Sequence, residues 1–284
     1  MKHIISTVVA LAAGINCTAI LPSEAVFHNE KSDTTRISEI LINAAGISDP
    51  QERTLIIAEE FVGTPYAAGT LEGEEELLRI NIDSLDCTTF AETVLALSYT
   101  AGEKRTSWRD FVYNLERMRY RGGNINGYSS RLHYFSDWVV DNVHRGNIKD
   151  ATTRMPVNDW EVKTIDFMTE HRDKYPKLAD QEEYEKLKNC EIGYRNHRFP
   201  YIKVNKLGNK DMINALQDGD LVALTTKIPG LDVTHMGFIK KINGNLHLIH
   251  ASSKKGKVIV DETKLTEYMR RSGATGLRVI RLAE

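Results

Sequence analysis

The stretch SLDCTTFAETVLALSYT, residues 84–100, carries the strongest helix signal in the chain and a cysteine near its start. Apolar side chains at Phe90 and Val94 recur at helical spacing from Cys87, which predicts a buried helix with this cysteine in its first turn. Asp86 directly precedes Cys87 and can cap the helix. We expect the unpaired N–H groups and the dipole of this helix end to favour the Cys87 thiolate over the thiol.

Composition and charge limit the classes of protein that the chain can belong to. Its 284 residues, 41% hydrophobic and 27% charged, are typical of a globular protein with two domains or one domain carrying an insertion. The net charge of −2 gives no basic footprint, so we expect no nucleic-acid partner. The three cysteines are too few for a disulfide scaffold or a four-cysteine zinc site, and we expect neither a metal nor an organic cofactor.

The N-terminus has the pattern of an export signal. A basic start is followed by the apolar run IISTVVALAAGI, residues 4–15, and then by small residues, which predicts a signal peptide within residues 1–25. Cleavage after Ala19 or Ala25 would fit. A lipoprotein anchored through Cys17 is less favoured, because an asparagine stands where a small residue is expected. We therefore expect an exported, periplasmic or cell-envelope protein whose mature chain has no membrane span.

The order of the expected elements indicates the fold class. Helical periodicity dominates residues 26–101, a polar and largely helical stretch follows at 102–208, and short strands dominate 209–284. Helices followed by an antiparallel sheet predict an α+β fold. We interpret 102–208 as an insertion that shapes the substrate site between two halves of one core. The expected strands are GDLVALTT (219–226), THMGFIKKI (234–242), GNLHLIHAS (244–252), KVIVD (257–261) and GLRVIRLAE (276–284).

A histidine in the later strands could serve Cys87 as a base. A cysteine nucleophile needs a base within hydrogen-bond reach, and that base needs an orienting partner. His235 lies at the start of THMGFIK, where Gly237 permits the close approach of another strand. Alone, Cys87 could be a buried core residue and His235 a solvated strand residue. Together they predict a catalytic pair.

The hairpin around Asn243-Gly244 identifies the orienting partner. This dipeptide predicts a two-residue turn, which sets the register of the two strands. In that register His250 lies opposite Gly237, close to His235, whereas His247 lies farther along the hairpin. Because His247 and His250 differ by three positions, they face opposite sides of the sheet and cannot share a metal. We therefore expect His250 to orient His235.

Two further segments offer candidate substrate contacts. Tyr66, in GTPYAAGT, could donate to a developing oxyanion beside the N–H of Cys87, or could simply pack at the edge of the helix. In RLHYFSDWVVDN (131–142), a continuous helix would place an arginine and two aromatic residues on one face, suited to a sugar-peptide ligand with carboxylates. The alternative is that the aromatic residues lie in the core and the arginine in solvent. The candidate substrate-binding residues are Asp86, Arg131, His133, Tyr134 and Trp138. RMRYRGG (117–123) is interpreted as a solvated helix end.

Taken in order, GTPY, DCTTF, THMGF and IHAS resemble the superfamily of bacterial cell-wall cysteine amidases and peptidases named after the lipoprotein NlpC. The resemblance implies a compact papain-like α+β core. By motif position it implies that Cys87 is the nucleophile, His235 the general base and His250 the orienting third member. It also implies that Tyr66 lies beside the oxyanion site.

The motifs also depart from the commonest form of that superfamily. The usual Asp-Cys-Ser-Gly-Phe is here DCTTF, and Ala67 follows the tyrosine where a tryptophan is usual. The variants GTLE, LDCTTFAET, SRLHYFSDW and LDVTHMGF resemble a branch of N-acetylmuramoyl-L-alanine amidases that act on peptidoglycan fragments. We therefore expect an amidase whose partners are muropeptides. The alternatives are a γ-D-glutamyl-diaminopimelate endopeptidase, a non-catalytic cell-wall binding module and a zinc amidase.

Overall fold

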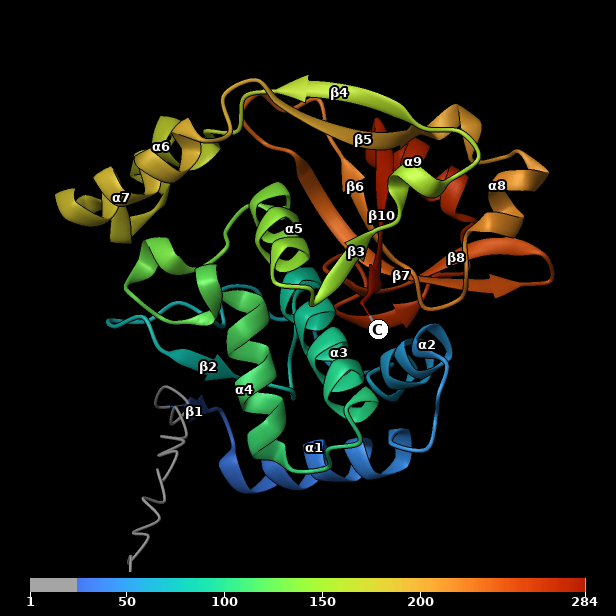
Figure 1. The fold of residues 1–284 in the computed structure, drawn as a ribbon, viewed down its shortest axis with the longest axis horizontal. Coiled ribbons are helices and arrows are strands. Elements are labelled where there is room, and N and C mark those ends of the chain that lie inside the picture. The colour runs from blue at the N-terminus through green and yellow to red at the C-terminus, as the bar shows by residue number, and fades with distance from the viewer. Residues whose placement is uncertain (1–24, 284) are drawn as a thin grey trace, which may run out of the picture.

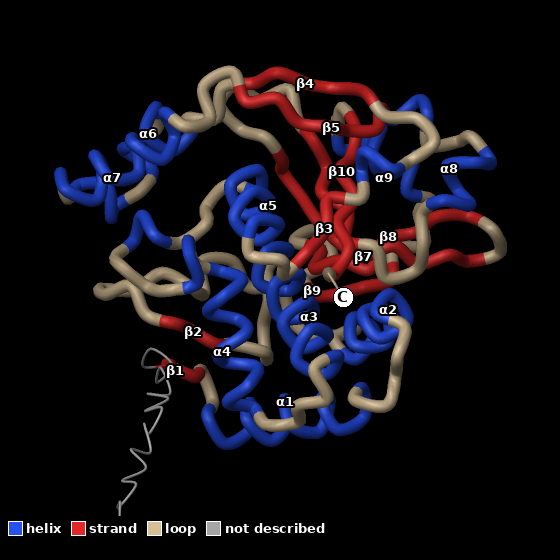
Figure 2. The backbone as a smooth tube through the Cα atoms, viewed as in Figure 1, coloured by secondary structure: helices blue, strands red, loops and turns tan. Residues whose placement is uncertain are grey.

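Five helices from the first half of the chain form a layer on one face of a sheet built mainly by the second half (Figures 1 and 2). The computed structural model of the protein describes residues 25–283. The predicted signal peptide thus lies outside the described residues, apart from Ala25. The helices are α1 (Glu30–Ala44), α2 (Pro50–Glu60), α3 (Cys87–Gly102), α4 (Trp108–Arg119) and α5 (Phe135–His144). Two short strands, β1 (Ala25–Phe27) and β2 (Leu78–Ile80), pair in parallel.

The large sheet has eight strands, and all of its neighbouring pairs run antiparallel. Its order is β4-β5-β10-β6-β7-β8-β9, with β3 pairing with the end of β10. The predicted α+β class is confirmed. The strands are β3 (Ile148–Asp150), β4 (Asp159–Lys163), β5 (His197–Lys203), β6 (Leu221–Thr225), β7 (Val233–Ile242), β8 (Asn245–Ser252), β9 (Lys257–Val260) and β10 (Gly276–Leu282).

Each face of the sheet packs into its own hydrophobic core. Successive side chains of a strand point to opposite faces, so Leu221 joins the core shared with α3 and Val222 joins the other. That second core is covered by α8 (Lys210–Ala215) and α9 (Leu265–Ser272). Helix α3 packs against β7 and β8. This packing brings the N-terminus of α3 to the beginning of β7.

Residues 102–208, which we interpreted as a largely helical insertion, contribute to both layers. Helices α4 and α5 share the core of α3, and β3, β4 and β5 belong to the sheet. The sequence missed these strands because β3 is short, β4 lies at the edge of the sheet and β5 contains Pro200, which weakens a strand signal. Helices α6 (Phe167–Glu170) and α7 (Gln181–Ile192) belong to a third, smaller cluster at the upper left of Figure 1.

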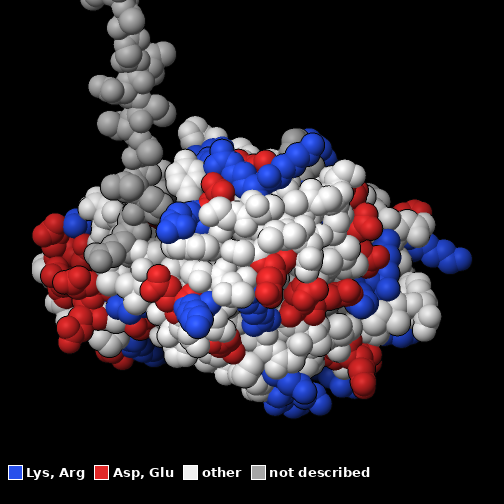
Figure 3. All heavy atoms as spheres, turned by 90° about the horizontal axis from the view of Figure 1, so that it is seen from below, with Lys and Arg blue, Asp and Glu red and all other residues white. Residues whose placement is uncertain are grey.

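Charged residues of both signs are distributed over the surface. On the face shown in Figure 3, groups of Lys and Arg lie among groups of Asp and Glu. This mixture agrees with the near-neutral net charge of the chain. None of the helices within residues 25–283 is long and apolar enough to span a bilayer.

Candidate active site

Cys87 is the first residue of α3, as predicted, and Asp86 is its cap. The Asp86 carboxylate accepts the N–H of Thr89 at 2.8 Å, and the Thr89 hydroxyl accepts the N–H of Asp86 at 2.9 Å. This reciprocal capping box satisfies two backbone donors at the helix end and fixes the direction in which the chain enters the helix. The Cys87 sulfur accepts a hydrogen bond from the backbone N–H of Met236 in β7. The thiol is thereby held beside the strand that carries His235.

Cys87 and His235 line the same cavity, which has a volume of about 130 Å³. Its apolar walls come from α5, β7 and the segment before α5. These walls include Leu132, Phe135, Trp138, Val233 and Met236. Folding therefore brings the side chains of Cys87 and His235, which are far apart in the sequence, to the wall of one cavity. Beside such buried apolar walls, electrostatic interactions are stronger than in solvent.

The three side chains His235, His250 and Asp261 form a continuous hydrogen-bonded chain. His235 Nε2 lies 2.6 Å from His250 Nδ1, and His250 Nε2 lies 3.3 Å from Asp261 Oδ2. The ring of Tyr268 from α9 packs against both imidazoles, at centroid distances of 5.9 and 5.2 Å. His235 and His250 are thus held on the face of the sheet that α9 covers.

The hairpin register that we predicted for the two histidine strands is confirmed. Lys240 pairs with His247 and Phe238 with Ile249, which places His250 opposite Gly237. A Cβ atom on Gly237 would lie 2.9 Å from the His250 Cβ and 2.7 Å from the Ile249 carbonyl oxygen. Glycine is therefore required at 237 for His250 to pack as it does.

The chain of hydrogen bonds also sets which nitrogen atoms carry protons. The Asp261 carboxylate can only accept, so His250 Nε2 must be protonated and His250 Nδ1 must accept. His235 Nε2 then donates to His250 Nδ1, and a neutral His235 keeps an unprotonated Nδ1. This free nitrogen is the atom that can take a proton from a neighbouring thiol.

Asp261 was missed by the sequence analysis. It follows β9 directly and is fixed by two backbone hydrogen bonds, from its own N–H to Leu248 and from Thr263 N–H to its side chain, both 2.8 Å. Burial alone would raise the pKa of this carboxyl, but the hydrogen bonds from Thr263 and His250 outweigh it and lower the pKa. An aspartate ending a strand that pairs with the His250 strand was the available signal.

The expected thiolate is not favoured in the unliganded protein. Burial, with the nearby Asp86 carboxylate, raises the pKa of Cys87 to about 11, and this outweighs the helix end and the Met236 N–H. Burial and the neighbouring His250 lower the pKa of His235 to about 3. Both groups are therefore uncharged at neutral pH. The expectation that the helix N-terminus would favour the thiolate was wrong, because it left burial out.

Tyr66 lies close to the thiol. Its backbone N–H donates to the Gly256 carbonyl at 2.9 Å, and it forms a bridge with Leu85, two residues before Cys87. Partial burial, together with Cys87 and Asp86, raises the pKa of the phenol, which therefore stays protonated and able to donate a hydrogen bond.

Comparison with known proteins identifies the family of the chain. A family profile named AmiA-like, N-acetylmuramoyl-L-alanine amidase-like, matches residues 56–276. The chain belongs to this family. The predicted resemblance to N-acetylmuramoyl-L-alanine amidases is confirmed at this level, and the protein is an enzyme of this amidase family.

Solved structures give the same relationship. An N-acetylmuramoyl-L-alanine amidase from Bacteroides uniformis is 37% identical, with a TM-score of 0.78 over 83% of this chain and 99% of its own. A Bacteroides fragilis protein described as a candidate xylanase is 40% identical, with a TM-score of 0.75 over 80% of this chain and 99% of its own. A Legionella pneumophila protein that is 24% identical shares the fold, with a TM-score of 0.70 over 90% of this chain and 96% of its own. No curated protein matches the chain.

In this amidase, the predicted helical face of Arg131, Tyr134 and Trp138 does not exist. Helix α5 begins only at Phe135, and Arg131 lies in an extended segment that bridges to Tyr120. Arg131 and Tyr134, at the two ends of the segment before α5, both have extended backbone dihedral angles. The three side chains consequently point into different surroundings.

Arg131 is engaged inside the protein, contrary to both sequence-based interpretations. Its guanidinium is buried and lies 2.8 Å from a Glu72 carboxylate oxygen and 3.4 Å from one of Glu76. Tyr134 is also buried, and its hydroxyl donates to Glu191 at 2.6 Å. Neither residue lines the Cys87 cavity. Tyr134 instead lines a second, aromatic cavity, and the alternative that the two aromatic residues lie in the core is confirmed.

His133 and Trp138 do line the Cys87 cavity. His133 Nε2 lies 2.8 Å from the Tyr128 carbonyl oxygen, and burial with the nearby Arg131 lowers its pKa to about 3. The indole N–H of Trp138 is buried without a hydrogen-bond partner. Asp86, the fifth predicted contact, serves as the helix cap and is not a wall of this cavity.

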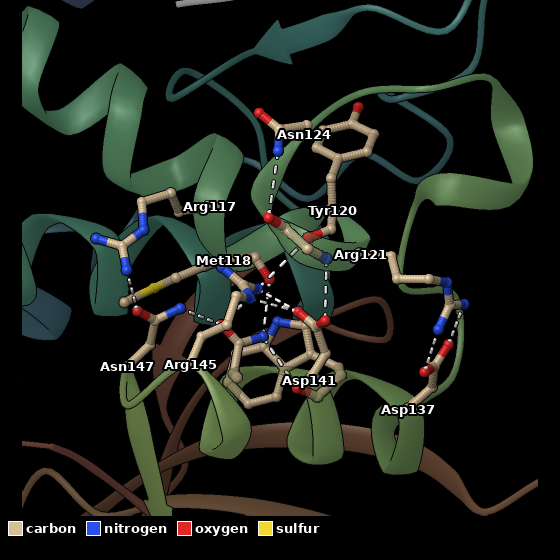
Figure 4. A network of polar contacts seen from close by, with 12 residues as sticks. Arg117, Met118, Tyr120, Arg121, Asn124, Asp137, Asp141, Arg145 and Asn147 are labelled. Atoms are coloured by element: carbon tan, nitrogen blue, oxygen red, sulfur yellow. Dashed lines mark hydrogen bonds and ion pairs between the residues drawn. The ribbon is translucent and has the colours of Figure 1, made fainter. Parts of the chain in front are cut away.

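The arginines of RMRYRGG are not a solvated helix end. Arg119 is buried, with its Nε 2.6 Å from a Glu92 carboxylate oxygen. Arg121 makes a two-pronged contact with Asp137 at 2.7 and 2.6 Å. Figure 4 shows Arg121 and Asp137 facing each other, with Arg117 reaching Asn147 on the other side. Arg119 thus joins α4 to α3, Arg121 joins the segment after α4 to α5, and Arg117 joins α4 to the loop after α5. These partners are distant in the sequence, where spacing gives no signal.

A second cavity, of about 360 Å³, adjoins the first. The two share His133 and Leu231 as walls. The second is rich in aromatic side chains, namely Tyr128, Tyr134, Phe167 and Tyr175.

Cys190 and Cys87 are both free thiols. Within residues 25–283, no three His, Cys, Asp or Glu side chains are arranged to hold a metal ion.

Proposed function

We propose that this family member is a cysteine amidase that cleaves the amide between N-acetylmuramic acid and L-alanine in peptidoglycan or its fragments. The observation that carries the proposal is the shared cavity of Cys87 and His235, with His250 and Asp261 hydrogen-bonded in line behind the imidazole. A nucleophile, a base and an orienting chain are the parts that acyl transfer requires. The NlpC-type, papain-like core expected from the motifs belongs to the same proposal.

The first half of the reaction forms a thioester. Cys87 transfers its proton to His235 Nδ1 as its sulfur attacks the lactyl carbonyl carbon, so that a charged pair arises only when substrate is present. The N–H of Cys87 and the Tyr66 hydroxyl donate to the oxyanion of the tetrahedral intermediate. When the intermediate collapses, the C–N bond breaks and His235 protonates the leaving alanine nitrogen.

The second half restores the thiol. Water attacks the thioester while His235 Nδ1 takes one of its protons. The C–S bond then breaks, the muramic lactyl group leaves as a carboxylic acid, and the proton returns to the Cys87 sulfur. His250 and Asp261 keep His235 Nε2 protonated throughout, so Nδ1 is the only imidazole nitrogen that exchanges protons.

The surroundings of the thiol favour an amidase over glycoside hydrolysis, the activity suggested for the Bacteroides fragilis relative. Glycosidases use a pair of carboxyl groups as acid and base or nucleophile. Two carboxylates line the Cys87 cavity, and both already have partners. Glu92 pairs with Arg119 at 2.6 Å, and Asp232 accepts the N–H of Ser136 at 2.5 Å. The aromatic cavity beyond His133 would instead hold the sugar ring on the acyl side of the bond.

The mass of the products tests the proposal. Wild-type protein incubated with a defined N-acetylmuramoyl-tripeptide should release the free peptide and N-acetylmuramic acid. Cys87→Ala should release neither while keeping the circular dichroism spectrum and melting temperature of the wild type. Full activity of this variant would refute the cysteine mechanism.

The same digest separates the rival functions. A shortened muropeptide that keeps its sugar would indicate an endopeptidase. Tight binding without any product would indicate a binding module. Loss of activity with a chelator would indicate a zinc amidase.

We also propose export, on the basis of the N-terminal sequence. N-terminal sequencing of protein recovered from the producing bacterium should begin after Ala19 or Ala25. An unprocessed N-terminus in the cytoplasmic fraction would contradict it.

A further inference from the structure

A third cavity, of about 390 Å³, lies on the other side of His235. His235 is a wall of both this cavity and the Cys87 cavity, whereas Cys87 lines only the latter. Three cationic side chains, Lys254, Lys255 and Arg271, border the third cavity. The active-site imidazole is therefore a wall shared by the small Cys87 cavity and a larger cavity with cationic side chains at its border.

The two lysines lie on the tight turn between β8 and β9, which is fixed on both sides. Within the turn, the N–H of Lys255 donates to the Ser252 hydroxyl at 3.3 Å. From outside, the N–H of Tyr66 donates to the Gly256 carbonyl at 2.9 Å. The turn is thus tied to the segment that carries Tyr66, so the lysines have a defined position relative to the thiol and the imidazole.

Asp261 is the acidic residue among the walls of this cavity, and its carboxylate is already engaged, as is that of the nearby Glu267. Asp261 accepts hydrogen bonds from His250 and Thr263, and Glu267 forms an ion pair with Arg271. Neither Lys254 nor Lys255 has an ion-pair partner among the described residues. Hydroxyl groups of Ser252, Ser253 and Thr263 add neutral hydrogen-bonding groups. The cavity therefore offers unneutralised positive charge to a ligand.

The chemistry of the proposed reaction fixes which half of the substrate lies here. The leaving amine receives its proton from His235 Nδ1, so its nitrogen lies between the sulfur and the imidazole, and the peptide that follows it extends past His235 toward the third cavity. The acyl half stays with Cys87 and extends toward the aromatic cavity. Stem peptides carry carboxylates, at the glutamate α-carbon and at the C-terminus, within a few residues of the alanine.

We propose that the cavity bordered by Lys254 and Lys255 binds a carboxylate of the peptide leaving group and gives the enzyme a preference for acidic stems. This inference rests on the proposed amidase function. The two possible sources of the carboxylate, the glutamate α-carboxyl and the C-terminal carboxyl, share the same chemistry and are separated by the substrates below.

The test compares four synthetic substrates of N-acetylmuramoyl-L-alanyl dipeptides. They carry D-glutamate, whose α-carboxyl is free, or D-isoglutamine, whose α-carboxyl is amidated, at the second position. Each of the two is made with its other carboxyl, which is the C-terminal end of the stem, either free or amidated. Steady-state kcat and KM are measured for wild type, Lys254→Ala/Lys255→Ala and the charge-reversed Lys254→Glu/Lys255→Glu. Lys210→Ala, at the exposed start of α8, is the matched loss of a surface cation.

For wild type, the preferred acid substrate should have a kcat/KM on the order of tenfold above its amide, through KM rather than kcat, as expected for one charge-assisted hydrogen bond. The double alanine variant should lose this ratio, the double glutamate variant should invert it, and Lys210→Ala should keep it. The amidated position that lowers kcat/KM identifies which of the two carboxylates the third cavity binds.

Equal cleavage of all four substrates by wild type, or an unchanged ratio in both double variants, would overturn the subsite and leave the amidase function intact. Release of no peptide from any substrate by wild type would overturn both.

Discussion

Replacing Asp261 by asparagine tests the hydrogen-bonded chain behind His235. The substitution keeps the size of the side chain and removes its charge. The Asp261 carboxylate can only accept, but an asparagine can also donate to His250 Nε2. His250 would then be protonated at Nδ1 and donate to His235 Nε2, which forces the proton of a neutral His235 onto Nδ1. In that tautomer His235 cannot accept the proton of Cys87.

The expected loss follows from the contact itself. A hydrogen bond to a charged group contributes ~1.5–3 kcal/mol. At 1.36 kcal/mol for each factor of ten, this corresponds to a roughly ten- to hundredfold fall in kcat. The 3.3 Å separation of His250 Nε2 and Asp261 Oδ2 is long, which places the expectation toward the lower end. The loss should appear in kcat. Because Asp261 also lines the third cavity, removal of its negative charge should lower rather than raise the KM for an acidic peptide.

The assay is the steady-state release of peptide from an N-acetylmuramoyl-tripeptide across pH 4 to 9. Glu262→Gln is the matched control, because Glu262 is the adjacent exposed acid and its loss changes the net charge equally. Because the folded pKa of Asp261 lies below its usual value, its contribution is present at neutral pH and is lost only as pH falls through that lowered pKa. A kcat for Asp261→Asn within twofold of wild type, with the fold intact, would refute the tautomer argument.

Two further predictions follow from the same site. With its pKa raised to about 11 by burial, Cys87 should react with iodoacetamide slowly at pH 7, and the rate should rise about tenfold for each pH unit up to about pH 10. Peptide mapping separates this reaction from that of Cys190, and a rate independent of pH between 5 and 9 would instead indicate a thiolate–imidazolium pair already present in the free enzyme. Gly237→Ala should destabilise the fold by ~1–3 kcal/mol and lower kcat, because its Cβ would lie 2.9 Å from that of His250. Urea unfolding measures the first effect, and Gly208→Ala, which meets open space, should leave both properties unchanged.

Local sequence signals were sufficient where neighbouring residues determine the outcome. The apolar spacing after Cys87 and the cap at Asp86 predict α3 correctly, because helical periodicity and capping depend on residues within one or two turns. The Asn243-Gly244 turn likewise predicts the pairing of the two histidine strands, since a two-residue turn leaves one register. The placement of His250 opposite Gly237 could therefore be worked out before any coordinates.

Only the tertiary structure decided the charges and the partners within the site. Arg131 is paired with Glu72, 59 residues away, and no spacing rule links them. Asp261 reaches His250 only because β8 and β9 pair. The thiol pKa depends on burial by chain segments from across the whole fold, which outweighs the local helix end that the sequence displays. Backbone conformation is set largely by near neighbours, whereas desolvation and ion pairing sum over everything that folding brings close.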